Sequence, residues 1–112
     1  MTTLEFLRQN REQIIKIANR YGATNVRVFG SVARGDDDQD SDIDFLVDDI
    51  KFIKGLERVD LKSDLEDFLN KPVDVVIAHN LTGYRQERIN LEATVLWKIA
   101  TKNQTQKLQK NT

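Results

Sequence analysis

The chain has 112 residues, with 17 basic and 18 acidic side chains and a formal net charge of −1. This near balance argues against strong binding to nucleic acid through bulk charge. The sequence has no cysteine, which excludes disulfides, zinc–thiolate sites and thiol nucleophiles. No stretch approaches the ~18 apolar residues of a membrane span, and the N-terminal residues lack the apolar core of a signal peptide. We therefore expect one cytoplasmic, soluble domain with no membrane segment.

The first third of the chain predicts a helix, a strand and a helical turn. Apolar residues such as Leu4, Leu7 and Ile14 recur at helical spacing over residues 3–20, and a Tyr-Gly pair then ends the pattern. A short apolar run predicts a strand at residues 26–30. Residues 31–34 predict a helical turn, which Gly35 ends.

The rest of the chain predicts two further strands and two helices. In chain order these are a strand at residues 42–47, a helix at 53–70, a strand at 73–78 and a helix at 84–100. The apolar stripes of the two helices consist of Leu56, Leu61, Leu65, Phe68 and Leu69, and of Ile89, Ala93, Leu96, Trp97 and Ala100. A helix joins the second and third strands, so we expect them to be parallel neighbours with a right-handed crossover. The predicted fold class is α/β (α+β), a small mixed sheet with helices packed against it over residues 1–100, followed by a polar tail at residues 101–112.

Three aspartates interrupt the predicted strands. In the second strand aspartates alternate with apolar residues, which places Asp42 and Asp44 on one face. Unit charges 4 Å apart near a protein surface repel each other by about 4 kcal/mol, and a cation between them would remove this cost. Asp74 lies in the apolar third strand, where a carboxylate is costly to bury unless it is paired or bound to a metal. The pattern predicts a three-carboxylate site for Mg²⁺, with two ions as in two-metal phosphoryl transfer, and Asp74 is also a candidate proton acceptor.

A turn of small residues follows the first strand. Gly30 lets the backbone approach a phosphate closely, and Ser31 supplies a hydroxyl and an N–H group. A helical turn after them would aim further N–H groups at the anion. We therefore expect the triphosphate of a nucleotide to bind here. A P-loop is excluded because aspartates stand where Lys and Ser/Thr are required, and an EF-hand is excluded because apolar residues stand where its glycine is required.

These residues together carry a resemblance to a known family. The stretch that begins at Gly30 reads GSVARGDDDQDSDIDFLV. It resembles the signature of the DNA polymerase β-type nucleotidyltransferase superfamily, and in particular its minimal nucleotidyltransferase (MNT) domains. The resemblance implies the polymerase β-type nucleotidyltransferase fold. It implies that Gly30 and Ser31 bind phosphate and that Asp42 and Asp44 bind the metal, with Asp74 as the third carboxylate and Arg34 as a phosphate contact.

The same resemblance implies a function. MNT proteins of this size resemble antitoxins that pair with HEPN-domain ribonuclease toxins and transfer AMP from ATP to a toxin tyrosine. It therefore implies a Mg²⁺-dependent adenylyltransferase in a hetero-oligomer with a HEPN toxin. Two alternatives stay open at this point. One is an antitoxin that masks its toxin by stoichiometric binding without catalysis, and the other is a small-molecule nucleotidyltransferase subunit of the antibiotic-modifying type.

Several other polar or aromatic residues have simpler explanations. The remaining aspartates at residues 36–40 are typical of a solvated acidic loop. The single histidine, His79, follows a strand and is expected at the surface, as are Arg85 and Arg88 on the polar side of the last helix. Trp97 fits the apolar stripe of that helix and is expected in the core.

Overall fold

The structure, a computed structural model, describes residues 1–48, 50, 57–80 and 83–95. Its elements in chain order are α1 (Thr3–Gln9), α2 (Arg11–Arg20), β1 (Arg27–Phe29), α3 (Gly30–Arg34), β2 (Ile43–Val47), α4 (Glu57–Leu69), β3 (Val73–Ile77), a 3₁₀ turn (Ala78–Asn80), α5 (Gly83–Glu92) and β4 (Thr94–Val95). None of the helices in these ranges is long and apolar enough to cross a membrane.

The four strands form one mixed sheet in the order β3-β2-β1-β4. Strands β2 and β3 are parallel, as predicted, and β1 is antiparallel to both β2 and β4. The predicted fold class is confirmed. Strand β4 was not predicted, because it consists of two residues that follow a helix directly.

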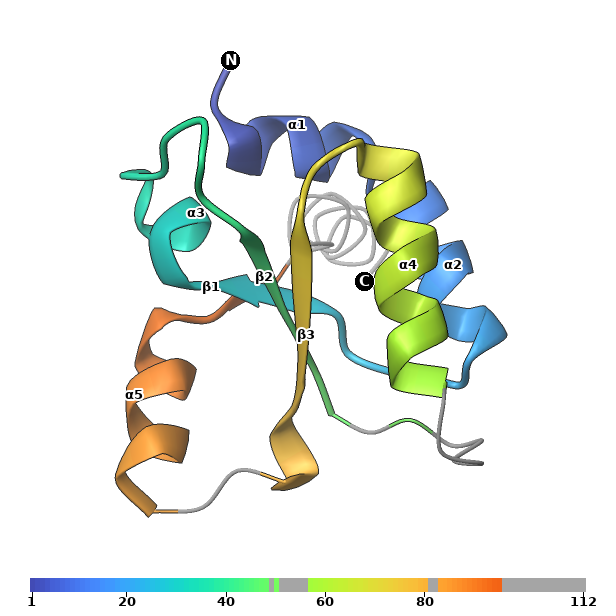
Figure 1. Ribbon diagram of the computed structural model, residues 1–112. Helices are drawn as coiled ribbons and strands as arrows, with labels where there is room; N and C mark the ends of the chain where they lie inside the picture. The colour runs from blue at the N-terminus through green and yellow to red at the C-terminus, as the bar shows by residue number, and fades with distance from the viewer. Residues whose placement is uncertain (49, 51–56, 81–82, 96–112) are drawn as a thin grey trace, which may run out of the picture.

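Helices cover the sheet on both faces, and Figure 1 shows α1, α2 and α4 on one side and α5 on the other. On the first side the buried side chains of the three helices pack against Ile43, Phe45 and Val47 of β2. On the second side Leu46 packs against Ile89 of α5. Leu46 lies on the same strand face as Asp44 but is fully buried, because α5 covers that face at Leu46.

The predicted first helix, residues 3–20, is wrong as a single element, because the chain forms two helices that meet at Asn10. The side-chain Nδ2 of Asn10 donates to the carbonyl of Phe6 at 2.9 Å, and its backbone N–H donates to the same carbonyl at 3.2 Å. A short amide side chain that bonds to nearby backbone in this way competes with helix continuation.

Helix α1 begins at a cap in which Thr2 Oγ1 accepts from the N–H of Glu5 at 3.1 Å.

Two helix predictions need correction towards the C-terminus. The predicted helix at residues 84–100 ends at Glu92, and the chain continues into β4, where the β-branched pair Thr94-Val95 extends the sheet beside β1. Phe68 is 40% exposed and does not belong to the apolar stripe of α4. The buried residues Leu61, Leu65 and Leu69 are four apart, and Phe68 lies about 60° to one side of the centre of the helix face that they define. Residues 53–56 of the predicted second helix, together with Leu96, Trp97, Ala100 and the tail at 101–112, lie outside the described residues.

Candidate active site

The turn between β1 and α3 presses directly against the aspartate of the next strand. Phe29, the last residue of β1, pairs with Asp44 of β2 across the antiparallel ladder. Gly30 follows with φ +70°, and a Cβ atom added to it would lie 2.5 Å from Asp44 Oδ2. Glycine is therefore required here for two reasons, the left-handed backbone and the closeness of the carboxylate.

Helix α3 is one short turn, as predicted, and Gly35 ends it with φ +81°. The carbonyl of Ser31 accepts hydrogen bonds from the N–H groups of Gly35 and Asp36, at 2.9 and 3.0 Å. At the other end of α3, Phe29 gives no side-chain cap to the first N–H groups. The predicted helical turn after the Gly-Ser pair is confirmed, and Ser31 is half-buried beside Gly30.

Two of the three predicted carboxylates lie side by side. Asp44 on β2 and Asp74 on β3 are Cα partners in the parallel ladder, so their side chains extend from the same face of the sheet. Both residues are half-buried. Asp42 lies immediately before β2 and is exposed, two residues from Asp44 and so on the same side. The fold therefore brings two of these side chains into register and leaves the third at the rim.

The charges of this group act on one another. Burial raises the pKa of Asp44 above its ordinary value of 3.8, and the negative charges of Asp74 and then Asp42 raise this pKa further. No described side chain forms an ion pair with any of the three carboxylates. Neighbouring oxygen ligands that repel one another, with no protein cation between them, fit a hard divalent cation such as Mg²⁺. Within the described ranges, no group of three or more His, Cys, Asp or Glu side chains is close enough to hold a metal ion, so the three-carboxylate site stays a prediction.

Arg34 lies at the end of α3 between two carboxylates. Its Nε donates to Asp36 Oδ2 at 3.2 Å, and its Nη1 donates to Glu92 Oε1 at 3.1 Å. The hydrogen bond from Arg34 to Asp36 raises the pKa of the guanidinium. Glu92 was not among the predicted site residues, because 58 positions separate it from Arg34 and only the packing of α5 beside α3 brings the two together. No signal in the sequence indicates this pair.

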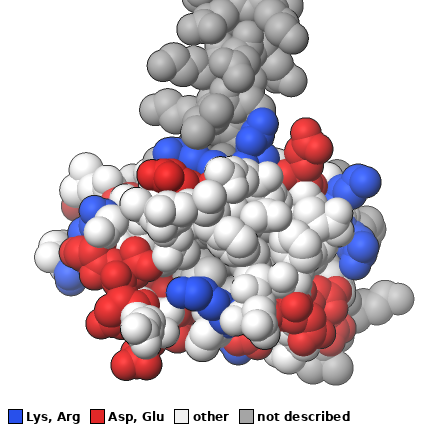
Figure 2. Space-filling model, turned by 90° about the horizontal axis from the view of Figure 1, so that it is seen from above, with Lys and Arg blue, Asp and Glu red and all other residues white. Residues whose placement is uncertain are grey.

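The other aspartates after α3 form the acidic loop that the sequence predicted. Figure 2 shows red side chains gathered over this loop, between α3 and β2. Asp37 accepts a hydrogen bond from Thr3 Oγ1 at 2.6 Å, which ties the loop to α1. Asp38 accepts from Ser41 Oγ and from the N–H of Asp40, at 3.1 and 2.9 Å. These hydrogen bonds give Asp37 and Asp38 a structural role in the loop, and they do not involve Asp42 or Asp44 of the candidate active site.

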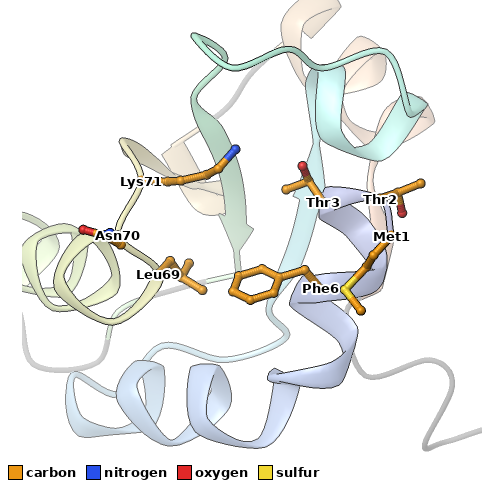
Figure 3. A pocket seen from close by; sticks show the side chains of 7 residues that line it. All are labelled: Met1, Thr2, Thr3, Phe6, Leu69, Asn70 and Lys71. Carbon is orange, nitrogen blue, oxygen red and sulfur yellow. The ribbon is translucent and has the colours of Figure 1, made fainter.

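The surface residues outside this group behave as predicted where the structure describes them. His79, Arg85 and Arg88 are exposed. A pocket of about 350 Å³ lies between the start of α1 and the end of α4. In Figure 3 the ring of Phe6 points towards Leu69 across this pocket. None of the predicted site residues lines it, and it is separate from the candidate active site.

The fold is that of a nucleotidyltransferase domain. It superposes on a solved structure described as a minimal nucleotidyltransferase with a TM-score of 0.72 and 41% sequence identity, over 84% of this chain and 95% of the other. The family model for polymerase β nucleotidyltransferases matches residues 12–102, and the chain belongs to this family.

Relatives within the family carry more specific names. A protein of Methanocaldococcus jannaschii assigned as a protein adenylyltransferase, MJ0435, is 36% identical over 83 residues, which cover 74% of this chain and 89% of the relative. The protein adenylyltransferase MntA of Thermococcus cleftensis is 36% identical over 66 residues, or 59% of this chain and 67% of the relative. The same fold occurs in an MNT antitoxin solved in complex with the tri-AMPylated HEPN toxin of Shewanella oneidensis (TM-score 0.61, 21% identity, 94% of this chain and 91% of the other). The resemblance to minimal nucleotidyltransferases is confirmed.

Proposed function

We propose that this chain is a Mg²⁺-dependent protein adenylyltransferase and an antitoxin. In this proposal it transfers AMP from ATP to a tyrosine hydroxyl of a cognate HEPN ribonuclease toxin and so neutralises the toxin. The observation that carries the proposal is the contact between the Gly30 turn and Asp44, with Asp74 paired beside Asp44 on the next strand. The names of the relatives, protein adenylyltransferase and MNT antitoxin with a HEPN toxin, support the choice of donor and acceptor.

The proposed reaction needs three actions from the protein. The Gly30–Ser31 turn holds the triphosphate through backbone N–H groups and the serine hydroxyl. The toxin hydroxyl forms a bond to the α-phosphorus, the bond from that phosphorus to the pyrophosphate oxygen breaks, and pyrophosphate leaves. The hydroxyl proton passes to Asp74, whose half-buried carboxylate stands beside Asp44.

Asp42, Asp44 and Asp74 are the residues that would hold Mg²⁺. When bound, two such ions supply the positive charge that stabilises the attacking and leaving oxygens. The raised pKa of Asp44 supports this assignment, because burial and the two neighbouring charges make an unbound carboxylate at this position unfavourable.

Mass spectrometry of the intact partner tests the proposal. The purified chain is incubated with ATP, Mg²⁺ and its cognate HEPN protein, and we expect the mass of that partner to rise by whole AMP units. The double variant Asp42→Ala/Asp44→Ala should abolish the increase. Asp40→Ala is the matched control, because Asp40 is an exposed carboxylate of the same loop and contributes only its backbone N–H to a hydrogen bond there.

The outcomes separate the proposal from its competitors. A double variant that still modifies the partner would show that the site assignment is wrong. A wild-type chain that blocks the toxin without changing its mass would favour masking by stoichiometric binding. Transfer of AMP to a small molecule but not to the partner would favour the antibiotic-modifying class.

A further inference from the structure

The guanidinium of Arg34 is held by two carboxylates of unequal exposure. The side chain of Glu92 is 24% exposed, whereas that of Asp36 is 62% exposed. Solvent and salt screen an exposed ion pair more than a sheltered one. Glu92 is therefore the better shielded partner of the two, and it comes from a different part of the fold, the last position of α5.

Arg34 lies on the face of α3 that confronts the aspartates. Gly30 and Arg34 are four residues apart in a helix and so share a face, and Gly30 is the residue that touches the Asp44 carboxylate. The charges of Arg34 and Glu92 both act on Asp44, the first lowering its pKa and the second raising it. The Arg34–Glu92 pair therefore lies at the edge of the candidate active site.

The hydrogen bonds to Asp36 and Glu92 leave part of the guanidinium available. Nε and Nη1 donate to Asp36 and Glu92, while Nη2 donates to no residue that the structure describes. A guanidinium has five N–H donors in a rigid planar fork, and two of them are on Nη2. These two donors can form charge-assisted hydrogen bonds to phosphate oxygens.

The position of Glu92 is unfavourable for the helix itself. It is the last residue of α5, and this helix has no basic residue in its last turn. An acidic side chain at a helix C-terminus opposes the helix dipole. Helix stability therefore does not explain Glu92, and its contact with Arg34 offers a reason for it.

We propose that Glu92 is a positioning residue, which fixes the guanidinium of Arg34 so that Nη2 contacts a phosphate of the bound nucleotide. This inference rests on the proposed function, because it takes the ligand to be a nucleoside triphosphate. With Glu92 in place, the arginine side chain loses little freedom when the phosphate binds. Without Glu92, only the exposed Asp36 restrains Arg34. The nucleotide must then order the arginine side chain when it binds, and this lowers the affinity for the nucleotide.

Isothermal titration of the full chain with ATP and Mg²⁺ measures this effect directly. We expect Glu92→Ala to weaken ATP binding by about tenfold, which is within the range for hydrogen bonds to charged groups. Glu92→Gln should restore part of the affinity, because its amide oxygen still accepts from Nη1. Glu87→Ala is the matched control, since Glu87 is an exposed glutamate on the same helix, and it should bind ATP as the wild type does.

Two further measurements separate positioning from a structural role. The midpoint of thermal unfolding should change little in both Glu92 variants, because the loss of the ion pair with Arg34 is offset by the removal of a charge that opposes the helix dipole. The double variant Arg34→Ala/Glu92→Ala should bind ATP no more weakly than Arg34→Ala, since Glu92 acts through Arg34.

Each contrary result has a definite meaning. Unchanged or tighter ATP binding in Glu92→Ala, or additive losses in the double variant, would overturn the positioning role, and tighter binding would show that Glu92 competes with the phosphate. If the wild type binds ATP and modifies its partner while Glu92→Ala behaves identically, only this inference fails. If the wild type neither binds ATP nor modifies the partner, the proposed function fails and the inference falls with it.

Discussion

Replacing Gly30 by alanine tests two requirements at this position, the left-handed backbone conformation and the space for the Asp44 carboxylate. The backbone at Gly30 has φ +70°, a conformation that costs an L-residue roughly 1–2 kcal/mol. The new Cβ atom would also lie 2.5 Å from Asp44 Oδ2, whereas ordinary contacts begin near 3.4 Å. The turn and the carboxylate must therefore move apart by nearly 1 Å, and a displacement of this size at a reacting group costs about 100-fold in rate.

Gly35→Ala is the matched control for the backbone term. Gly35 has φ +81°, but no atom lies within 4 Å of the position its Cβ would take. Both variants should lower the free energy of unfolding by roughly 1–2 kcal/mol, which shifts the unfolding midpoint by about 4–10 °C for a domain of this size. Only Gly30→Ala should also displace the Asp44 carboxylate.

The assay compares stability and AMP transfer in the two variants side by side. Urea or thermal unfolding gives the stability of each, and the mass of the partner gives the transfer rate at a temperature where both variants are folded. We expect Gly30→Ala to transfer AMP about 100-fold more slowly and Gly35→Ala to transfer it near the wild-type rate. Equal losses of transfer in both variants, or full transfer by Gly30→Ala, would refute the reasoning that the glycine serves the carboxylate.

Three further predictions concern stability. Because the pKa of Asp44 is raised in the folded state, the folded chain binds more protons than the unfolded chain just above pH 3.8, and stability falls as the pH rises through this window. Asp44→Asn should therefore raise the unfolding midpoint at pH 7 without divalent cations, and the gain should vanish below the ordinary Asp pKa. Tyr21→Phe should lower the free energy of unfolding by about 1 kcal/mol at pH 7, because Tyr21 Oη donates to Asp64 of α4. The difference should shrink between pH 10 and the raised Tyr21 pKa of about 12. Ile89→Ala should cost about 2–4 kcal/mol in urea unfolding, since Ile89 and Leu46 are the buried residues that join α5 to the sheet. A loss below 1 kcal/mol would mean that α5 is held by other contacts.

The sequence was most informative where local chemistry decides local structure. Alternation of aspartate with apolar residues predicted β2, and Gly35 predicted the end of α3. The helix joining β2 and β3 predicted that these strands are parallel, and parallel pairing places Asp74 beside Asp44. The Gly-Ser turn followed by Asp-x-Asp also identified the family, because these residues lie close together in the chain.

The sequence was least informative where a local pattern fits more than one structure and where distant segments meet. A helical pattern over residues 3–20 does not show that the Asn10 side chain ends α1, since the same residue also occurs within helices. The helical pattern over residues 84–100 does not show that α5 ends at Glu92 and that the chain continues into β4, because this strand exists only through its ladder with β1. Phe68 fits a helical stripe as well as the buried leucines of α4 do, and only the packing of α4 against the sheet shows which side of the helix is buried.

Turn residues, strand alternation and motif spacing are local properties, so the amino-acid sequence is enough to establish the fold class, the family and the short stretch that carries the candidate chemistry. The contact of Gly30 with the Asp44 carboxylate and that of Glu92 with Arg34 appear only in the folded chain. Both contacts depend on how α3 packs between β2 and α5. That packing follows from burying apolar side chains on both faces of the sheet, and no spacing within the chain encodes it.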